Sequence, residues 1–327
     1  MEQIFASVSI DAQAEFSFEG HPNNTQLEHL QMLYNLGFRR VSFGVQDYDE
    51  TVQKAIHRIQ PYAHVARVTQ WARDIGYKSI SHDLIYGLPF QTWDKMEATI
   101  QKTIQLKPDR IAFYSYAHVP WIKGVGQRGF SEADLPMGAE KRMLYELGKK
   151  LFHQAGYDEI GMDHFSLQSD DLYKSQKQGT LHRNFMGYTS GKTQLMIGLG
   201  MSAISDSWYA FAQNEKNLEA YQERVAEGVL PIVKGHLLNS EDLFIRKQIL
   251  QLMCQLESHW EAHEFPELIL DVKKRLQELA DDGLVEIQEN GLKIPESAKA
   301  FVRNIAMAFD QRLYKNAPDT PIFSSTI

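Results

Sequence analysis

The sequence contains almost no cysteine. Its 327 residues include one, Cys254, which lies in an apolar helical pattern between Leu250 and Leu256. A single thiol forms no intrachain disulfide, and alone it cannot hold a structural zinc ion or an iron-sulfur cluster, because each of these needs several ligands. We therefore interpret Cys254 as a small, buried apolar residue of a helix.

Long apolar runs and an excess of positive charge are also missing. No stretch approaches the roughly 20 apolar residues that span a bilayer, and the start, Met1 to Ile4, lacks the basic and apolar regions of a secretion signal. The 42 acidic residues outnumber the 34 basic ones, and the net charge of -8 opposes nonspecific binding to nucleic acid or anionic membranes. These features predict a cytoplasmic protein with neither nucleic acid nor a membrane as its partner.

The first part of the chain alternates short apolar runs with amphipathic stretches. Strands are expected at residues 15–19, 41–45, 79–85 and 110–116, with helices between them. This alternation is typical of an α/β fold built from parallel β/α units joined by right-handed crossovers. Four such units are visible.

The stretches between the strands carry helix signals. A capping box at residues 25–28 opens one helix, a second spans 62–76, and a third starts at Thr92 and ends before Pro108. A shorter helix is expected at 49–59. A further helix over 138–156 is predicted to turn three apolar side chains inward: Met143, Leu147 and Leu151.

The predicted strands end in polar and aromatic residues, at 19–21, 46–48, 83–87 and 114–118. Parallel sheets place their ligand sites at the carboxyl ends of their strands, so we expect these residues to share one site. An acceptor such as Asp83 with an amide such as Gln46 suits a ribose diol, and the guanidinium of Arg58 suits a carboxylate. Together they match an adenosine-bearing amino acid. The alternatives are that Arg58 lies on the surface of the 49–59 helix and that Asp83 caps a neighbouring helix.

Other motifs favour structural interpretations. Residues 187–193 (GYTSGKT) have three residues between the glycines where a phosphate-binding loop needs four, and the glycine pattern at 198–203 lies outside the β/α series. His164 and His182 lack the spacing of a helical zinc site, so hydrogen bonding is favoured over metal binding. The basic run Lys273 to Arg275 lies among acidic residues, which indicates a solvated helix face and not a DNA-binding surface.

The chain is expected to have three parts, residues 1–120, 121–239 and 240–327. The last part reads as two helices, a hairpin around Asn290 and Gly291, and a final helix, which resembles a winged-helix pattern.

Several strings resemble the oxygen-independent coproporphyrinogen III oxidases, a family of radical S-adenosylmethionine (SAM) enzymes. The strand-related strings are residues 15–19 (EFSFE), 43–47 (FGVQD), 83–89 (DLIYGLP) and 116–120 (YAHVP). Strings at 161–165, 181–189, 198–205 and 303–307 continue the likeness, which covers essentially the whole chain. The resemblance implies an incomplete radical-SAM-type (β/α) barrel followed by a mainly helical C-terminal domain.

The resemblance also implies roles for individual residues. Gln46 and Asp83 would contact the ribose of SAM, Arg58 its carboxylate, and Glu19 the cofactor; Glu19 is also the candidate catalytic residue. Further positions would line the cofactor and substrate cavity: Ile85, Ala117 and Ile204. The candidates in substrate loops are His164, His182, Arg183 and Met186, where the family more often has glutamine at the position of Met186. Lys123 and Arg128 join Arg183 as candidate cations for substrate carboxylates.

The implied reaction converts two propionates of coproporphyrinogen III to vinyl groups, in haem biosynthesis. In the family a [4Fe-4S] cluster on three cysteines cleaves SAM, and the resulting radical removes a propionate hydrogen. Family members begin with two further β/α units that carry these cysteines, and this chain has neither, which indicates an internal start, a truncated gene or an excised fragment. We therefore expect this polypeptide alone to hold no cluster and not to turn over.

Two further expectations follow. The missing strands would leave a sheet edge exposed, so the chain is expected to form homo-oligomers through that edge. The alternative function is a noncatalytic protein that retains a pocket for haem, another tetrapyrrole or SAM.

Overall fold

The computed structural model describes residues 2–120 and 130–315, so Lys123 and Arg128 lie outside the described residues. The chain forms two compact units, with the division between Lys174 and Ser175. The segment after residue 130 contributes β5 (Tyr157–Ile160) and β6 (His164–Leu167) to the sheet of the first unit.

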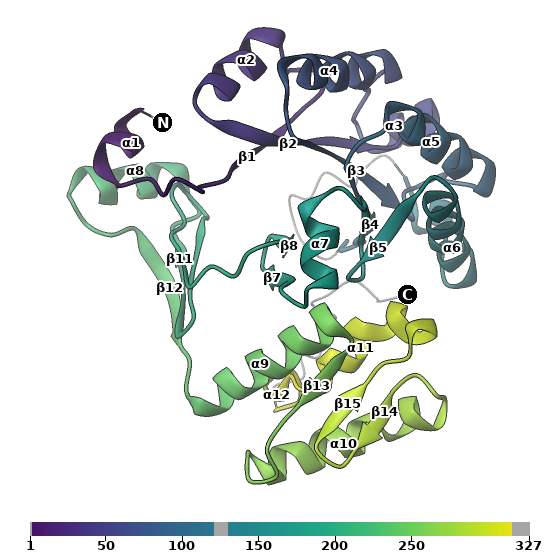
Figure 1. Ribbon diagram of the computed structural model, residues 1–327, viewed down its shortest axis with the longest axis vertical. Helices are drawn as coiled ribbons and strands as arrows, with labels where there is room; N and C mark the ends of the chain where they lie inside the picture. Colours follow the sequence, from purple (N-terminus) through teal and green to yellow (C-terminus); the bar gives the residue numbers. More distant parts are fainter. Residues whose placement is uncertain (1, 121–129, 316–327) are drawn as a thin grey trace. The chain divides into compact units, whose positions relative to one another are not determined.

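The first unit is built on a six-stranded sheet with the order β1-β2-β3-β4-β6-β5 (Figure 1). The first four strands in this order are parallel, which confirms the predicted β/α units, whereas β6 is antiparallel to both β4 and β5. The sheet stays open, with β1 and β5 at its edges, as expected of an incomplete barrel. The strands are β1 (Phe16–Gly20), β2 (Phe38–Gln46), β3 (Ser79–Tyr86), β4 (Arg110–Ser115), β5 (Tyr157–Ile160) and β6 (His164–Leu167).

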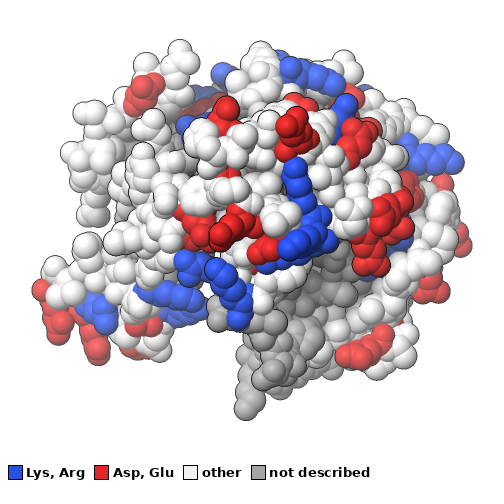
Figure 2. Space-filling view, turned by 90° about the horizontal axis from the view of Figure 1, so that it is seen from below, with Lys and Arg blue, Asp and Glu red and all other residues white. Residues whose placement is uncertain are grey.

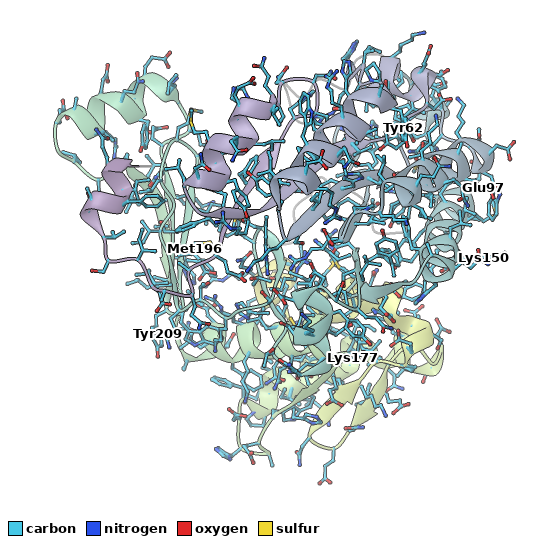
Figure 3. All side chains as sticks on the ribbon, turned by 45° about the horizontal axis from the view of Figure 1, so that its top comes forward. Tyr62, Glu97, Lys150, Lys177, Met196 and Tyr209 are labelled. Atoms are coloured by element: carbon cyan, nitrogen blue, oxygen red, sulfur yellow. The ribbon has the colours of Figure 1, made fainter. Side chains whose placement is uncertain are left out.

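Helices cover one face of this sheet. Alternate residues of the strands, such as Val41, Phe43 and Leu84, are buried on that face. Figure 3 shows Glu97 and Lys150 on the outer side of these helices. The helices and the short 3-10 turn of this unit are α1 (Glu2–Ser7), α2 (Leu27–Asn35), α3 (Glu50–Ala55), α4 (Tyr62–Ile75), α5 (Trp93–Leu106), η1 (Glu132–Asp134) and α6 (Ala139–Gln154); α7 (Asp171–Lys177) spans the division between the units.

The opposite face of the sheet, which we call the polar face, carries the intervening residues of each strand. Glu19 on β1 pairs with Ser42 on β2, and Gly44 on β2 pairs with Asp83 on β3. On β6, His164 pairs with Ala112 of β4. The two-residue period of the strands therefore separates an apolar core from a polar surface.

Three local expectations are wrong in detail. α2 is capped by Gln26, whose backbone N–H donates to His29 Nδ1, while the Thr25 hydroxyl donates to the His21 carbonyl. α3 ends at Ala55, where the backbone turns and His57 adopts a φ of 53°. In α6, Leu147 and Leu151 are buried as expected, but Met143 is exposed and the neighbouring Leu144 is buried in its place.

The second unit contains a two-stranded hairpin, a four-stranded antiparallel sheet of order β12-β11-β10-β9, and a C-terminal part with the three-stranded sheet β13-β15-β14. The last sheet confirms the predicted hairpin and adds β13, which the sequence reading missed. The strands are β7 (His182–Asn184), β8 (Gly187–Thr189), β9 (Leu195–Met196), β10 (Ile204–Ser207), β11 (Ala210–Asn214), β12 (Ile232–Leu237), β13 (Glu257–His259), β14 (Glu286–Gln288) and β15 (Gly291–Lys293). The helices are α8 (Leu218–Ala226), α9 (Ser240–Gln255), α10 (Pro266–Asp281), η2 (Glu296–Phe301), α11 (Val302–Met307) and α12 (Gln311–Lys315).

Two cations of the basic run on α10 stabilise the C-terminal part from within. Lys273 donates to the carbonyls of Gln288 and Glu289, and Arg275 donates to the carbonyl of Ala308. On the face shown in Figure 2, basic and acidic side chains alternate, and no large surface of one charge is visible. No helix in the described ranges has both the length and the apolar character needed to cross a membrane.

Candidate functional site

The end of β2, the middle of β3 and the loop after α3 meet at Gly44 on the polar face. The Arg58 Nη2 atom donates a hydrogen bond of 2.6 Å to the Gly44 carbonyl. A Cβ atom at Gly44 would lie 2.9 Å from Arg58 Nη2 and 3.0 Å from Gln46 Nε2. Because Gly44 also pairs with Asp83 across β2 and β3, the structure brings Gln46, Arg58 and Asp83 to one place.

The end of β2 is irregular at this point. The register between β2 and β3 shifts between Gly44 and Gln46, and Gln46 has a φ of 68°. The buried Gln60 holds the distorted strand end by donating to the carbonyls of Gly44 and Val45 at 3.1 and 3.3 Å. A left-handed φ at a residue other than glycine costs about 1–3 kcal/mol and is found most often at functional sites.

Arg58 lies in the loop after α3 and not on a helix surface, so one alternative weighed for this residue is wrong. Its backbone N–H donates to the Gln53 carbonyl, which closes the turn. Burial lowers the pKa of the Arg58 guanidinium, and the Asp83 carboxylate opposes that change. The Nε atom is buried and has no hydrogen-bond partner in the described part of the chain. This N–H group is available to a ligand oxygen.

Asp83 is partly buried in the middle of the sheet. Its carboxylate accepts a hydrogen bond of 2.8 Å from the Ser42 hydroxyl. This hydrogen bond takes the place of the helix cap that was the alternative interpretation of Asp83. Burial raises the pKa of Asp83 to about 6; the Glu19 carboxylate adds to this rise, while Ser42, His164 and Arg58 reduce it. Glu19 itself is exposed on β1.

A buried carboxylate supports the loops that carry these residues. Asp47 is fully buried and accepts hydrogen bonds from Thr99 Oγ1, Gln91 Nε2 and the Asp49 backbone N–H, at 2.9, 2.7 and 2.6 Å. Gln91 also donates to the Ile85 carbonyl. One carboxylate therefore ties the end of β2 to the end of β3 and to α5.

The sequence reading missed the supporting residues Ser42, Asp47, Gln60 and Gln91. A polar residue at every second position of β2 was a signal for Ser42. No local pattern identifies Gln60 or Gln91, because each acts through contacts with strands that are distant in sequence.

Three further candidates lie in the first unit. Ile85 pairs with Tyr114 across β3 and β4, and Ala117 lies two residues beyond the end of β4, where it is exposed. The His164 Nδ1 atom lies 2.5 Å from Asp163 Oδ1, and its Nε2 atom lies 3.5 Å from the Tyr114 hydroxyl. His164 is therefore on the polar face, near enough to influence the pKa of Asp83.

The remaining candidates belong to the second unit. His182 and Arg183 lie on β7, Met186 lies in the turn of the β7–β8 hairpin with 68% of its surface exposed, and Ile204 begins β10. Burial lowers the pKa of His182, and the nearby Lys192 and Arg246 lower it further. The Arg183 guanidinium packs over the Tyr188 ring at 4.6 Å.

A pocket of about 500 Å³ lies at the amino ends of the strands, away from these residues. Its charged groups largely satisfy one another. Arg40 contacts both Glu15 and Asp171, and Arg110 contacts Asp170. This end of the sheet is therefore held together by ion pairs.

The residues present do not fit an iron-sulfur cluster. The full sequence supplies one thiol, Cys254, and burial raises its pKa to about 12. Among the described residues, no three histidine, cysteine, aspartate or glutamate side chains lie close enough together to hold a metal ion.

Comparison with known proteins decides the family. Residues 2–103 match the Radical SAM superfamily. The oxygen-independent coproporphyrinogen III oxidase of Helicobacter pylori is 38% identical over 320 residues, which cover 96% of this chain and 69% of the relative. The chain belongs to the oxygen-independent coproporphyrinogen III oxidase family.

Other members of this oxidase family give the same result. The protein of that name from Thermostichus vulcanus is 37% identical and is matched over 98% of its length. The solved structure of the coproporphyrinogen III oxidase from Escherichia coli, described as a radical SAM enzyme, superposes with a TM-score of 0.90 at 36% identity and covers 95% of this chain and 73% of that one. The fold and the family expected from the sequence are therefore confirmed.

Proposed function

We propose that the chain carries the SAM-binding and tetrapyrrole-binding residues of an oxygen-independent coproporphyrinogen III oxidase, which forms two vinyl groups from two propionates of its substrate. The supporting observation is the meeting of Gln46, Arg58 and Asp83 around Gly44, in a chain that shares 38% of its residues with a relative of that name. In a chain of this family, these three groups have the chemistry that SAM requires.

Each side chain has a proposed role. Asp83 accepts hydrogen bonds from the ribose hydroxyls with the help of Gln46, and Arg58 binds the carboxylate of the methionine moiety. Glu19 contacts the cofactor from the neighbouring strand. The proposed lining residues are Ile85 and Ala117 in the first unit and Ile204 in the second. The substrate-loop candidates are His164 in the first unit and His182, Arg183 and Met186 in the second.

The groups in the first unit fit SAM. The buried Nε–H of Arg58, which has no partner among the described residues, needs an acceptor, and a carboxylate would supply one. Asp83, with its pKa raised to about 6, is ionised at neutral pH and can accept from two hydroxyls. SAM held by these residues would be the source of radical chemistry at the substrate propionates in a complete enzyme. The protein positions the cofactor and excludes water.

Since Cys254 is the single thiol of the sequence, we infer that these 327 residues alone neither hold a [4Fe-4S] cluster nor turn over. Iron and sulfide analysis after anaerobic reconstitution measures this directly. A stoichiometric cluster would show that the inference is wrong.

Calorimetric titration with SAM tests the proposed cofactor site. We expect micromolar binding that weakens about tenfold to a hundredfold in Arg58→Gln and in Asp83→Asn, because each loses a charged hydrogen bond. Ser17→Ala, on an exposed position of β1, is the control and should bind as the unaltered chain does. No SAM binding, or equal binding by all variants, would contradict the proposal.

The single cysteine favours a second candidate, a noncatalytic protein that binds haem, another tetrapyrrole or SAM. Separate titrations with haem and with SAM show which of these ligands such a protein would bind. Micromolar haem binding by a chain that remains inactive when a complete cluster-binding segment is supplied would favour this candidate.

A further inference from the structure

Lys141 lies in the first turn of α6, next to the carboxyl ends of β3 and β4. Its side chain is partly buried, and burial lowers the pKa of its ammonium group. The positive end of the helix dipole also disfavours a cation at this place. A lysine that is both partly desolvated and at the positive end of a helix needs compensating contacts, and the structure shows two of them.

The ammonium group of Lys141 holds the end of β4. Its Nζ atom donates a hydrogen bond of 3.0 Å to the carbonyl of Tyr116, the residue that follows β4. The Tyr116 backbone N–H donates in turn to the Tyr86 carbonyl at 2.8 Å, which joins this point to the end of β3. Because a charged donor makes a stronger hydrogen bond than a neutral one, the ammonium fixes the peptide group that leads into Ala117.

The methylene groups of Lys141 pack against the end of β3. A Cβ atom at Gly87 would lie 2.7 Å from Lys141 Cε and 3.2 Å from both Cδ and Cγ. Gly87 is buried and has a φ of 83°, a left-handed conformation that glycine adopts without strain. Its missing side chain leaves room for the lysine, so one side chain contacts both strand ends.

These two strand ends carry the proposed lining residues of the first unit. Ile85 comes two residues before Gly87, and Ala117 directly follows Tyr116. Ile85 is also on the same face of β3 as Asp83, because residues two apart on a strand point to the same side. Since Asp83 is proposed to bind the ribose, we expect Ile85 and Ala117 to lie beside the nucleoside part of SAM and not beside its carboxylate.

We propose that Lys141 is a positioning residue of the adenosyl site, which anchors the ends of β3 and β4 so that Ile85 and Ala117 are held beside the nucleoside. The proposal rests on the function proposed above and adds a residue that acts through the backbone of its neighbours. Gln91 ties the end of β3 to β2 through Asp47. Lys141 extends this support to β4.

Calorimetric titration of the full chain with SAM and with 5′-methylthioadenosine tests this proposal, because the second ligand has the nucleoside but no carboxylate. Lys141→Met keeps the apolar stem and removes the charged donor, so binding of both ligands should weaken by the same factor, about threefold to tenfold. Arg58→Gln should weaken the binding of SAM alone. Lys141→Arg keeps the charge and the donor, and it should bind both ligands within about threefold of the unaltered chain.

The matched control is Lys150→Met, the same substitution at an exposed position of α6 (Figure 3). This control should bind both ligands as the unaltered chain does. The Tm of Lys141→Met should stay within a few degrees of that of the unaltered chain, because the loss of a partly buried charge offsets the lost hydrogen bond. Weaker binding of SAM alone, or weaker binding together with a large fall in Tm, would overturn the positioning role.

Hydrogen exchange tests the anchoring without any ligand. In Lys141→Met the Tyr116 N–H, which donates to Tyr86, should exchange about tenfold faster than in the unaltered chain, whereas Lys150→Met should leave its rate unchanged. Unchanged exchange in Lys141→Met would overturn the inference whether or not SAM binds.

Two outcomes separate this inference from the proposed function. If the unaltered chain and Lys141→Met bind SAM and 5′-methylthioadenosine equally well, the positioning role fails while the proposed function stands. If the unaltered chain binds no SAM, the proposed function fails and the inference fails with it.

Discussion

Ser42 donates a hydrogen bond of 2.8 Å to Asp83 across β2 and β3. This contact favours the charged form of a carboxyl group whose pKa burial raises to about 6. The hydroxyl therefore extends the pH range over which Asp83 can act as an acceptor.

Ser42→Ala removes this support. The pKa of Asp83 should rise further, so that a larger fraction is protonated near pH 6.5 and SAM binding weakens by roughly tenfold there. At about pH 8 the difference should shrink, because most of the carboxyl remains ionised. Calorimetric Kd values across this pH range measure the effect, with Ser17→Ala as the control. A loss of affinity that is the same at every pH would contradict this account.

Asp83→Asn should stabilise the fold at high pH while weakening SAM binding. A folded-state pKa raised from 3.8 to about 6 means that the folded chain holds the proton more tightly than the unfolded chain, so the contribution of Asp83 to stability falls as pH rises from about 4 to about 6. Above that range the cost is about 3 kcal/mol, from 1.36 kcal/mol for each pKa unit. The Tm of Asp83→Asn relative to the unaltered chain should therefore be higher by several degrees at pH 8 than at pH 4.

The exposed substitution Asp282→Asn serves as the control for that experiment. A Tm difference for Asp83→Asn that is independent of pH would show that the carboxyl carries no such cost.

Asp47→Asn should destabilise the chain and disturb the cofactor site. The new amide group would face the Gln91 amide, the Thr99 hydroxyl or the Asp49 N–H, all of which donate to Asp47. A broken buried network of this kind costs about 2–4 kcal/mol. Thermal unfolding should show a lower Tm, and SAM should bind more weakly to the folded protein. Asp74→Asn, on the exposed side of α4, should change neither quantity.

The free edge of β1 should promote self-association, because unpaired strand edges pair with other chains. Light scattering is expected to give twice the chain mass of 37.6 kDa. Ser17→Lys, which adds a charge at the edge, should shift the mass towards the monomer, whereas Gln31→Lys on α2 should not. A monomeric mass for the unaltered chain would exclude association through β1.

The sequence predicts much of the first unit because its signals are local. Strand period, helix caps and the glycine after α4 identify β1 to β4 and their crossovers within a few residues. The antiparallel strands β5 and β6 were not predicted, since their place in the sheet depends on pairing with β4. α3 was predicted too long, because the buried Gln53 and Gln60 hold each other and end the helix early.

The residues of the candidate site likewise include some that the sequence could predict and some that it could not. Gln46, Arg58 and Asp83 could be proposed from side-chain chemistry and from the ends of strands. Their supports Ser42, Asp47 and Gln91 could not be ranked, because their importance comes from burial and from partners far along the chain.

The absence of a side chain at Gly44 matters for the interpretation of related sequences. Even one added methyl group would have to displace the guanidinium of Arg58 or the amide of Gln46. In a homologue that keeps both polar residues but replaces this glycine, the adenosyl pocket should be reshaped although every proposed ligand-binding residue is still there. The residue at position 44 is therefore a simple marker for paralogues that no longer bind the nucleoside.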